Sequence, residues 1–193
     1  THWVSEKDDG IYDAMNKGIA NASGDIVGIL NSDDFYIHHH VIEHVVDAFK
    51  KNNTDSLFAD LIYVQSDNTD KQVRYWKSNP FKPRAFYSGW HPAHPTFFVK
   101  NEVYKKYGAF NLTFPLAADF ELMLRFLEKY KITSQYIPDA FVKMRLGGAT
   151  NKSVKNIIKQ NKECMQAFKV NGLNPPVLYP VYRLLPKLLQ YFK

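Results

Sequence analysis

The stretch at residues 25–34 reads DIVGILNSDD, an apolar run of strand length followed at once by two adjacent carboxylates. Apolar runs of this length suit a strand that is covered on both faces of a sheet. In an open α/β sheet, ligands bind at the carboxyl ends of the strands. Asp33 and Asp34 are therefore candidate ligands for Mg²⁺ or Mn²⁺, which bind a few carboxylates together with substrate phosphates. The alternative is that the pair caps the following helix, because Asp is common at helix N-termini.

Length and composition fit one globular domain of 193 residues with ordinary apolar content. The single cysteine, Cys164, excludes an intrachain disulfide and fits a reducing compartment. We therefore expect a cytoplasmic protein, with the inner face of the membrane as a further candidate location. The net charge of +6 indicates attraction to anions, although a solvated basic surface explains it equally well. The sequence has no zinc spacing, helix-turn-helix signal or RNP motif, so nucleic acid is not an expected partner.

Hydrophobic periodicity predicts an α/β order of elements along the chain. Helices are expected at residues 11–22, 38–51, 101–107, 119–129 and 151–170, and strands at residues 25–30, 56–65, 71–77, 96–100, 132–137 and 140–145. The helix at 38–51 would open on three consecutive histidines, residues 38–40. Consecutive side chains on a helix point in different directions, so this triplet favours an exposed helix start over a metal site.

A set of short segments occurs in a fixed order along most of residues 1–150. The first is a long block that leads into the strand before Asp33, and four shorter segments follow it. They read SEKDDGIYDAMNKGIANASGD at 5–25, HPTFF at 94–98, YGAFN at 107–111, ADFEL at 118–122 and GGAT at 147–150. Together they resemble the nucleotide-sugar-dependent glycosyltransferases of family 2, of bacterial type, which have the GT-A fold.

The resemblance implies an α/β fold of GT-A type, with a mixed, mainly parallel sheet and helices on both faces. Residues 1–150 would form the glycosyltransferase domain, and residues 151–193 a C-terminal helical extension. The implied reaction is inverting, metal-dependent transfer of a sugar from a nucleotide-diphosphate sugar to a hydroxyl acceptor. A glycan or a lipid-linked glycan is the expected acceptor, in surface polysaccharide or glycolipid synthesis.

The resemblance also implies roles for individual residues. Asp119 matches the catalytic base, and Asp33 and Asp34 match the motif that holds Mg²⁺ or Mn²⁺. The positions expected to line the donor site are Asp8, Asn16, Asn31 and Ser32, and those expected near the acceptor or the phosphates are His94, Glu121, Gly147 and Gly148. For Asp119 the alternative is a carboxylate that faces the helix dipole in the first turn of the helix expected at 119–129. If so, Glu121 is the next candidate for the base.

Two departures from the family pattern bear on function. The metal-binding motif often begins with Asp, and Asn31 stands at that position here. The family's opening strand–helix–strand unit is not found, so we expect an N-terminally incomplete domain that by itself binds donors weakly. An uncovered sheet edge and apolar surface would then favour self-association.

Three alternatives remain open from the sequence. A non-catalytic GT-A-like binding or assembly module fits the incomplete domain. For a glycoside hydrolase, Asp33 and Asp119 would be the paired carboxylates; a metal requirement argues against this class, because such enzymes generally need only the two carboxyls. The Leu-, Tyr- and Lys-rich segment 177–193 either makes peripheral contact with a membrane or packs back onto the domain.

Overall fold

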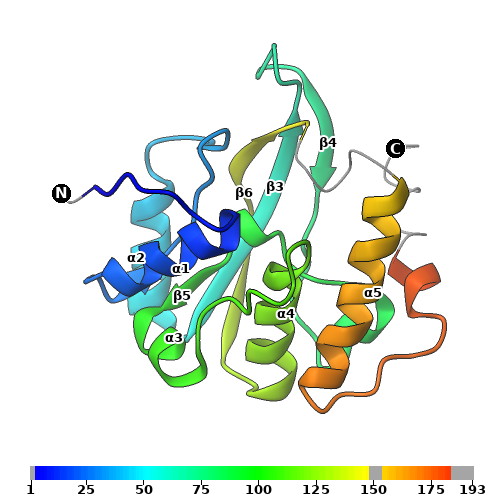
Figure 1. The fold of residues 1–193 in the computed structure, drawn as a ribbon. Coiled ribbons are helices and arrows are strands. Elements are labelled where there is room, and N and C mark those ends of the chain that lie inside the picture. Colours follow the sequence, from blue (N-terminus) through cyan, green and yellow to red (C-terminus); the bar gives the residue numbers. More distant parts are fainter. Residues whose placement is uncertain (1–2, 148–153, 184–193) are drawn as a thin grey trace.

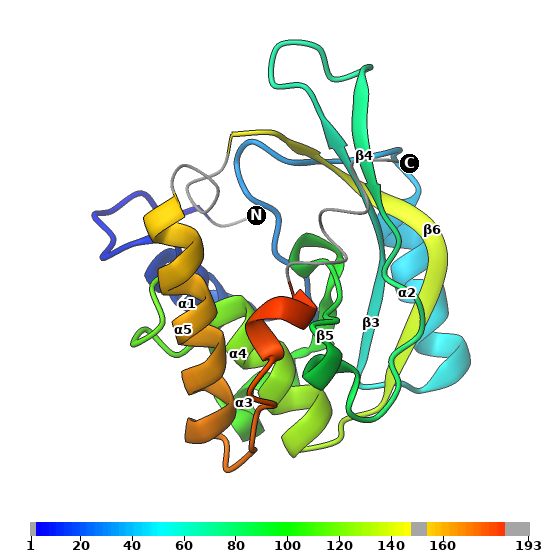
Figure 2. The same cartoon turned by 90° about the vertical axis from the view of Figure 1, so that its right-hand side faces the viewer.

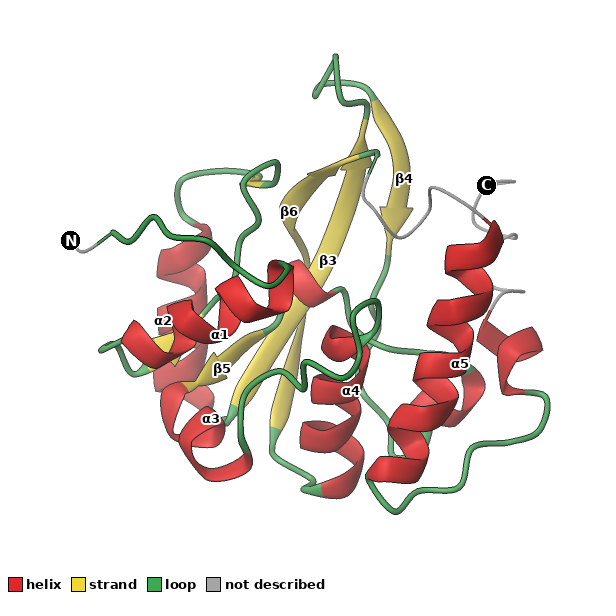
Figure 3. Ribbon diagram, viewed as in Figure 1, coloured by secondary structure: helices red, strands yellow, loops and turns green. Residues whose placement is uncertain are grey.

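The computed structural model of the protein describes residues 3–147 and 154–183. A mixed sheet forms its centre (Figures 1 and 3). Its strands are β1 (Ile26–Val27), β2 (Phe35–Tyr36), β3 (Ser56–Val64), β4 (Gln72–Trp76), β5 (Phe98–Lys100) and β6 (Ser134–Arg145). They run in the order β1-β5-β3-β6-β2, and β4 also pairs with β3. The mixed sheet is confirmed, but among the described strands only β3 and β6 are parallel, so the expectation of a mainly parallel sheet is wrong.

Helices cover both faces of this sheet, as expected. They are α1 (Ile11–Asn21), α2 (Val41–Asn52), α3 (Asn101–Tyr107), α4 (Ala118–Leu124) and α5 (Val154–Val170). Helix α4 continues into a π-helical turn at Arg125–Lys129, and short 3₁₀ turns occupy Ala85–Ser88 and His94–Thr96. In Figure 1, α1, α4 and α5 lie on one side of the sheet and α2 lies on the other.

Alternation along β3 sends its side chains into two separate cores. Leu57 and Leu61 pack in the same cluster as Val41 and Val45 of α2. Phe58, on the opposite face of the strand, belongs to the larger cluster formed with α3, α4 and α5. Because successive strand residues face opposite sides, one buried strand serves both layers.

Two strands differ most from their expected lengths. Residues 132–137 and 140–145 were expected as separate strands, but β6 runs through both. Its register against β3 shifts near Asp60, opposite Ala140, so Pro138 and Asp139 lie at a bulge and not in a turn. Proline has no N–H to donate to the ladder and is tolerated at bulges for that reason. Strand β1 stops at Val27, short of the expected residue 30, and the residue that follows it is a glycine because a Cβ there would overlap the ring of Phe98.

The helix starts also differ from expectation. Helix α2 begins at Val41, so the three histidines precede it. Asn101, the first residue of α3, donates from Nδ2 to the carbonyl oxygens of Ala22 and Gly24, each at 2.9 Å. That contact joins α3 to the end of α1. The N-cap of α4 is Ala117, so Asp119 is not the N-cap residue of that helix.

The described part of the segment 177–193 packs back onto the domain. Tyr179 is fully buried, with its ring 6.1 Å from that of Phe120 and 5.2 Å from that of Phe168. Arg183 is also buried and donates from Nη1 to Asn161 Oδ1 of α5 at 3.1 Å. Figure 2 shows this short helical turn beside α5. Within the described ranges, no helix is long and apolar enough to cross a membrane. The rest of the expected membrane segment, from 184 on, lies outside them.

Candidate active site

Asp119 lies where the first turn of α4 meets α1. The Tyr12 hydroxyl donates to Asp119 Oδ1 at 3.0 Å, across 107 residues of sequence. The Tyr12 ring stacks on Phe110 at 5.4 Å between centroids, and the His94 ring meets Phe110 edge-on at 5.7 Å. We call these four residues the Asp119 cluster. It places a carboxylate beside Tyr12 and near enough to His94 to affect its pKa, with one carboxylate oxygen held by a hydrogen bond.

The electrostatics of the Asp119 cluster keep its two neighbouring groups neutral. Burial, reinforced by the charge of Asp119, raises the pKa of the Tyr12 hydroxyl far above its usual value, so Tyr12 stays protonated. Burial lowers the pKa of His94, and the Asp119 charge opposes this only in part. At neutral pH the carboxylate of Asp119 therefore faces a phenol that donates and an uncharged imidazole.

The Asp33–Asp34 turn follows β1 and leads into β2. Asn31 Nδ2 donates to Asp34 Oδ2 at 2.9 Å, and the Asp34 backbone N–H donates to the Asn31 carbonyl at 3.1 Å. Arg145, at the end of β6, donates from Nη1 to the Asp33 carbonyl at 2.6 Å and covers the Phe35 ring. The pairing of β2 with β6 thus brings a guanidinium to the turn.

The carboxylate of Asp34 fits a cation ligand. Asp34 is only 6% exposed, and its Oδ1 atom is buried without a hydrogen-bond partner in the described structure. Burial raises the pKa of Asp34, because it destabilises the ionised carboxylate. A bound cation would offset that destabilisation. Asp33 precedes Asp34 in the chain and is exposed, and the negative charge of Asp33 adds to the rise of the Asp34 pKa. The pair suits Mg²⁺ or Mn²⁺ shared with phosphate oxygens.

A cleft of about 550 Å³ separates α1 from the turn. Its wall on the sheet side runs from Ile26 to Asp33 and includes Asn31 and Ser32, whereas Ile11 and Met15 are among the residues of its α1 side. Because Tyr12 belongs to the same helix, α1 borders both the cleft and the Asp119 cluster.

The other two expected donor-site residues make different contacts. Asp8 accepts from Lys17 Nζ at 2.9 Å, and this ammonium also pairs with Glu6 and Asp13. Asp8 and Lys17 line a second cleft of about 540 Å³. Asn16 exchanges two hydrogen bonds with the backbone of Phe110, at 2.9 and 2.8 Å. Asn16 thus holds the backbone of Phe110 in place, and its contact with the donor stays a prediction.

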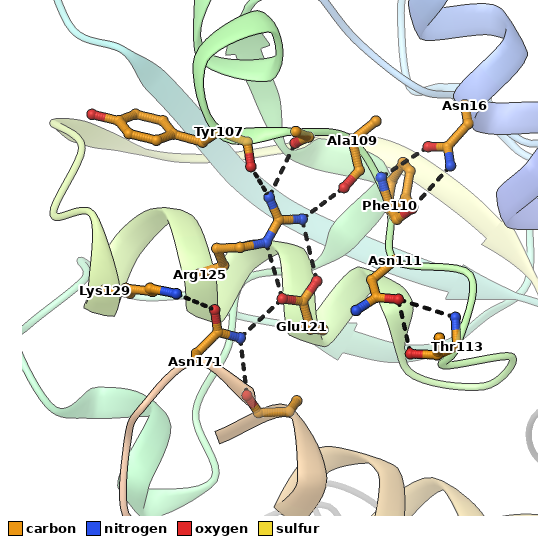
Figure 4. Close-up of polar contacts among 12 residues, drawn as sticks. Asn16, Tyr107, Ala109, Phe110, Asn111, Thr113, Glu121, Arg125, Lys129 and Asn171 are labelled. Atoms are coloured by element: carbon orange, nitrogen blue, oxygen red, sulfur yellow. Dashed lines mark hydrogen bonds and ion pairs between the residues drawn. The ribbon is translucent and has the colours of Figure 1, made fainter. Parts of the chain in front are cut away.

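Glu121 lies on the opposite side of α4 from Asp119 and is 2% exposed. Its carboxylate accepts from Arg125 Nε at 2.9 Å and from Asn171 Nδ2 at 2.9 Å (Figure 4). Arg125 also donates to the carbonyl oxygens of Tyr107, Gly108 and Ala109. This network supports the segment that ends at Phe110. Glu121 is thus engaged in a buried ion pair and does not fit the alternative role of base.

We expect Glu121→Ala to lower the free energy of unfolding by about 3–5 kcal/mol, the usual cost of leaving one buried partner of an ion pair uncompensated. Urea denaturation measures this change. Glu102→Ala is the matched control, because Glu102 is an exposed glutamate on α3 whose ion pair with Lys100 is long, at 3.7 Å. If both variants lose the same small amount of unfolding free energy, the buried network of Glu121 contributes no more to stability than an exposed ion pair does.

Gly147 follows Arg145 by two residues and has a positive φ of 126°. A side chain is strained in that backbone conformation, so this position favours glycine. Gly147 follows the end of β6, whose last residue, Arg145, contacts the Asp33 carbonyl, whereas Gly148 lies outside the described residues.

Sequence reasoning missed Tyr12, Phe110 and Arg145 as site residues. One signal was present for the first: Tyr12 and Asn16 are four residues apart, so a helix places both on one face. Both contact Phe110. Nothing in the sequence pairs that face with Phe110 or Asp119, because those contacts span about a hundred residues.

Comparisons with known proteins identify the family of the chain. The model of glycosyl transferase family 2 matches residues 3–108. Two Mycobacterium tuberculosis proteins, from strains CDC 1551 and H37Rv, are described as uncharacterized glycosyltransferases. Each is 35% identical over 125 residues, which cover 64% of this chain and 47% of the relative. The chain thus spans about half the length of these relatives.

Among solved structures, S. aureus TarS 1-349 in complex with UDP-GlcNAc superposes with a TM-score of 0.59 at 16% identity, over 98% of this chain and 55% of that one. Another crystal structure of TarS 1-349 gives a TM-score of 0.55 at 13% identity, over 84% of this chain and 52% of that one. Likeness at such identities shows the fold alone, which is GT-A. Because the family model matches more than half of the chain, including both α1 and the Asp33–Asp34 turn, the chain belongs to glycosyl transferase family 2.

Proposed function

We propose that the protein transfers a sugar from a nucleotide-diphosphate sugar to a hydroxyl acceptor, with inversion at the anomeric carbon. The observation that carries this proposal is the hydrogen bond from Tyr12 to Asp119, which orients a carboxylate at the start of α4. Family membership supports glycosyl transfer as the reaction class. The UDP-GlcNAc complex of TarS supports a nucleotide sugar as the donor, although that ligand was bound to TarS.

Asp119 acts as the general base in this proposal. The acceptor oxygen attacks the anomeric carbon from the face opposite the diphosphate. As that bond forms, the bond from the sugar to the diphosphate breaks, and its electron pair leaves with the diphosphate. The acceptor proton passes to Asp119. Tyr12 occupies one carboxylate oxygen and fixes the orientation of the group during the transfer.

Asp33 and Asp34 would hold Mg²⁺ or Mn²⁺ in the same proposal. The metal, when bound, would neutralise charge that develops on the leaving diphosphate. The hydrogen bond from Asn31 fixes Asp34 Oδ2 and leaves Oδ1 for coordination. Arg145 adds a positive charge at the same turn, which favours an anionic donor.

Donor profiling of the full-length protein with Mn²⁺ tests the proposal. The readout is release of nucleotide diphosphate from a panel of sugar nucleotides, with a glycan or lipid-linked glycan as acceptor. We expect release to depend on both acceptor and metal. Donor binding without turnover would favour the non-catalytic binding module, and hydrolysis of glycosides without any nucleotide would favour the hydrolase.

We expect Tyr12→Phe to lower kcat about tenfold and to leave KM for the donor nearly unchanged. The substitution removes one hydrogen bond to a charged group, which contributes about 1.5–3 kcal/mol, and part of that loss reaches the transition state. Steady-state kinetics measures the split between kcat and KM. Tyr130→Phe is the control, because Tyr130 is an exposed tyrosine at the end of the π-helical turn. A change confined to melting temperature would mean that Tyr12 only stabilises the fold.

A further inference from the structure

His38, His44 and Asp139 form a cluster that the proposed reaction does not use. Each offers a ligand atom, and these atoms all lie within 4.8 Å of one another. The residues come from the segment between β2 and α2, from the first turns of α2, and from the bulge in β6. None of them lines the cleft beside Asp33.

Strand register explains why two of the three residues meet. In the antiparallel pair of β2 and β6, Phe35 lies opposite Lys143, and Tyr36 lies opposite Val142. The Ile37 backbone N–H then donates to the Phe141 carbonyl at 3.0 Å. Continuing that register places His38 beside the Asp139–Ala140 bulge. The meeting therefore follows from the same pairing that brings Arg145 to the Asp33–Asp34 turn.

Helix α2 supplies the third residue. The His44 backbone N–H donates to the His40 carbonyl at 3.0 Å, so His44 lies one helical turn after the N-cap. Its ring is 5.5 Å from that of His38, centroid to centroid. The cluster thus joins the start of α2 to the bulge of β6.

The side chains of the cluster are suited to coordination. His38 Nδ1 is buried and has no hydrogen-bond partner among the described residues. Asp139 Oδ1 accepts from the Ala140 backbone N–H at 2.8 Å, which orients the carboxylate as outer contacts do in metal sites. His40 differs, because its Nδ1 pairs with Glu43 at 3.0 Å. The three consecutive histidines therefore do not act together, and His38 finds its partners elsewhere.

We propose that His38, His44 and Asp139 bind a divalent transition metal of the zinc type, with water in the remaining position. Two imidazoles and one carboxylate are ligands that such ions prefer, whereas Mg²⁺ and Ca²⁺ prefer oxygen alone. Bonds of about 2.0–2.2 Å need ligand atoms closer together than 4.8 Å. Rotation of the exposed His44 and Asp139 side chains supplies that approach. A bound ion would tie α2 to β6 and hold the segment that follows Asp34.

Calorimetric titration of the tag-free chain with Zn²⁺, after treatment with EDTA and dialysis, tests this site. We expect one equivalent to bind, and we expect His44→Ala and Asp139→Asn each to weaken binding at least tenfold. His39→Ala is the matched control and should bind as the unaltered chain does. Loading with Co²⁺ should give visible absorption bands that His44→Ala removes.

Several outcomes would overturn the site. They are the absence of Zn²⁺ binding, unchanged binding in His44→Ala, and an equal loss in His39→Ala. Loss of binding in Asp33→Ala would instead assign the ion to the Asp33–Asp34 turn and would also refute the proposal. Circular dichroism and a second variant, His44→Gln, guard against a loss that arises from misfolding alone.

Discussion

Asp119→Asn should lower kcat of the full-length protein by about a hundredfold or more, the range usual for removal of a general base. Asparagine keeps the size of the side chain and an oxygen that can accept from Tyr12, but it cannot take the acceptor proton. Donor binding should change little, because the donor is proposed to bind through the Asp33–Asp34 turn. Single-turnover kinetics and donor titration measure the two effects separately.

Asp47→Asn is the matched control for this variant. It makes the same chemical change, from a carboxylate to an amide, at an exposed residue of α2. Full turnover in Asp119→Asn would refute the assignment of the base. So would a variant that loses only melting temperature, since Asp119 would then serve the fold through its contact with Tyr12. Glu121 would not replace it without first breaking its ion pair with Arg125.

Asp33→Ala should abolish metal-dependent transfer and leave the fold intact. The Asp33 side chain is exposed at the rim of the cleft, so its loss removes a ligand without opening a cavity. The measurement is nucleotide diphosphate release across a Mn²⁺ titration, with melting temperature as the check on folding. Asp67→Ala, in the exposed turn between β3 and β4, is the control. Activity of Asp33→Ala, or full activity of the unaltered protein in EDTA, would contradict the metal role.

Asp34→Asn tests the metal role in a second way, through the stability of the protein as well as its activity. Burial raises the folded-state pKa of Asp34 above its ordinary value of 3.8, so the folded state holds its proton more tightly than the unfolded state. The contribution of Asp34 to the free energy of unfolding is therefore fully present below its ordinary pKa. This contribution is lost as the pH rises through the pKa of Asp34 in the folded state. At neutral pH and without metal, Asp34→Asn should be at least as stable as the unaltered chain, yet inactive. A marked loss of stability at neutral pH would show that the buried charge is already compensated.

The sequence by itself determined the family, most element positions and the Asp33–Asp34 turn. These depend on local patterns: an apolar run that ends in carboxylates, helical periodicity in α1, and a polar turn between β3 and β4. The hairpin expected at 56–65 and 71–77 is confirmed as β3 and β4. Such features need only neighbouring residues, so one chain read in order contains them.

Only the tertiary structure decided which side chains meet. The contact of Tyr12 with Asp119 spans 107 residues, and that of Arg145 with Asp33 spans 112. Helical geometry predicts that Asp119 and Glu121 point to different sides of α4. It does not predict that Glu121 is buried against Arg125 and Asn171. The expectation of two strands at 132–145 was wrong because Pro138 and Asp139 are as compatible with a bulge as with a turn. Pairing with β3 decided between the two, and it placed Asp139 beside His38.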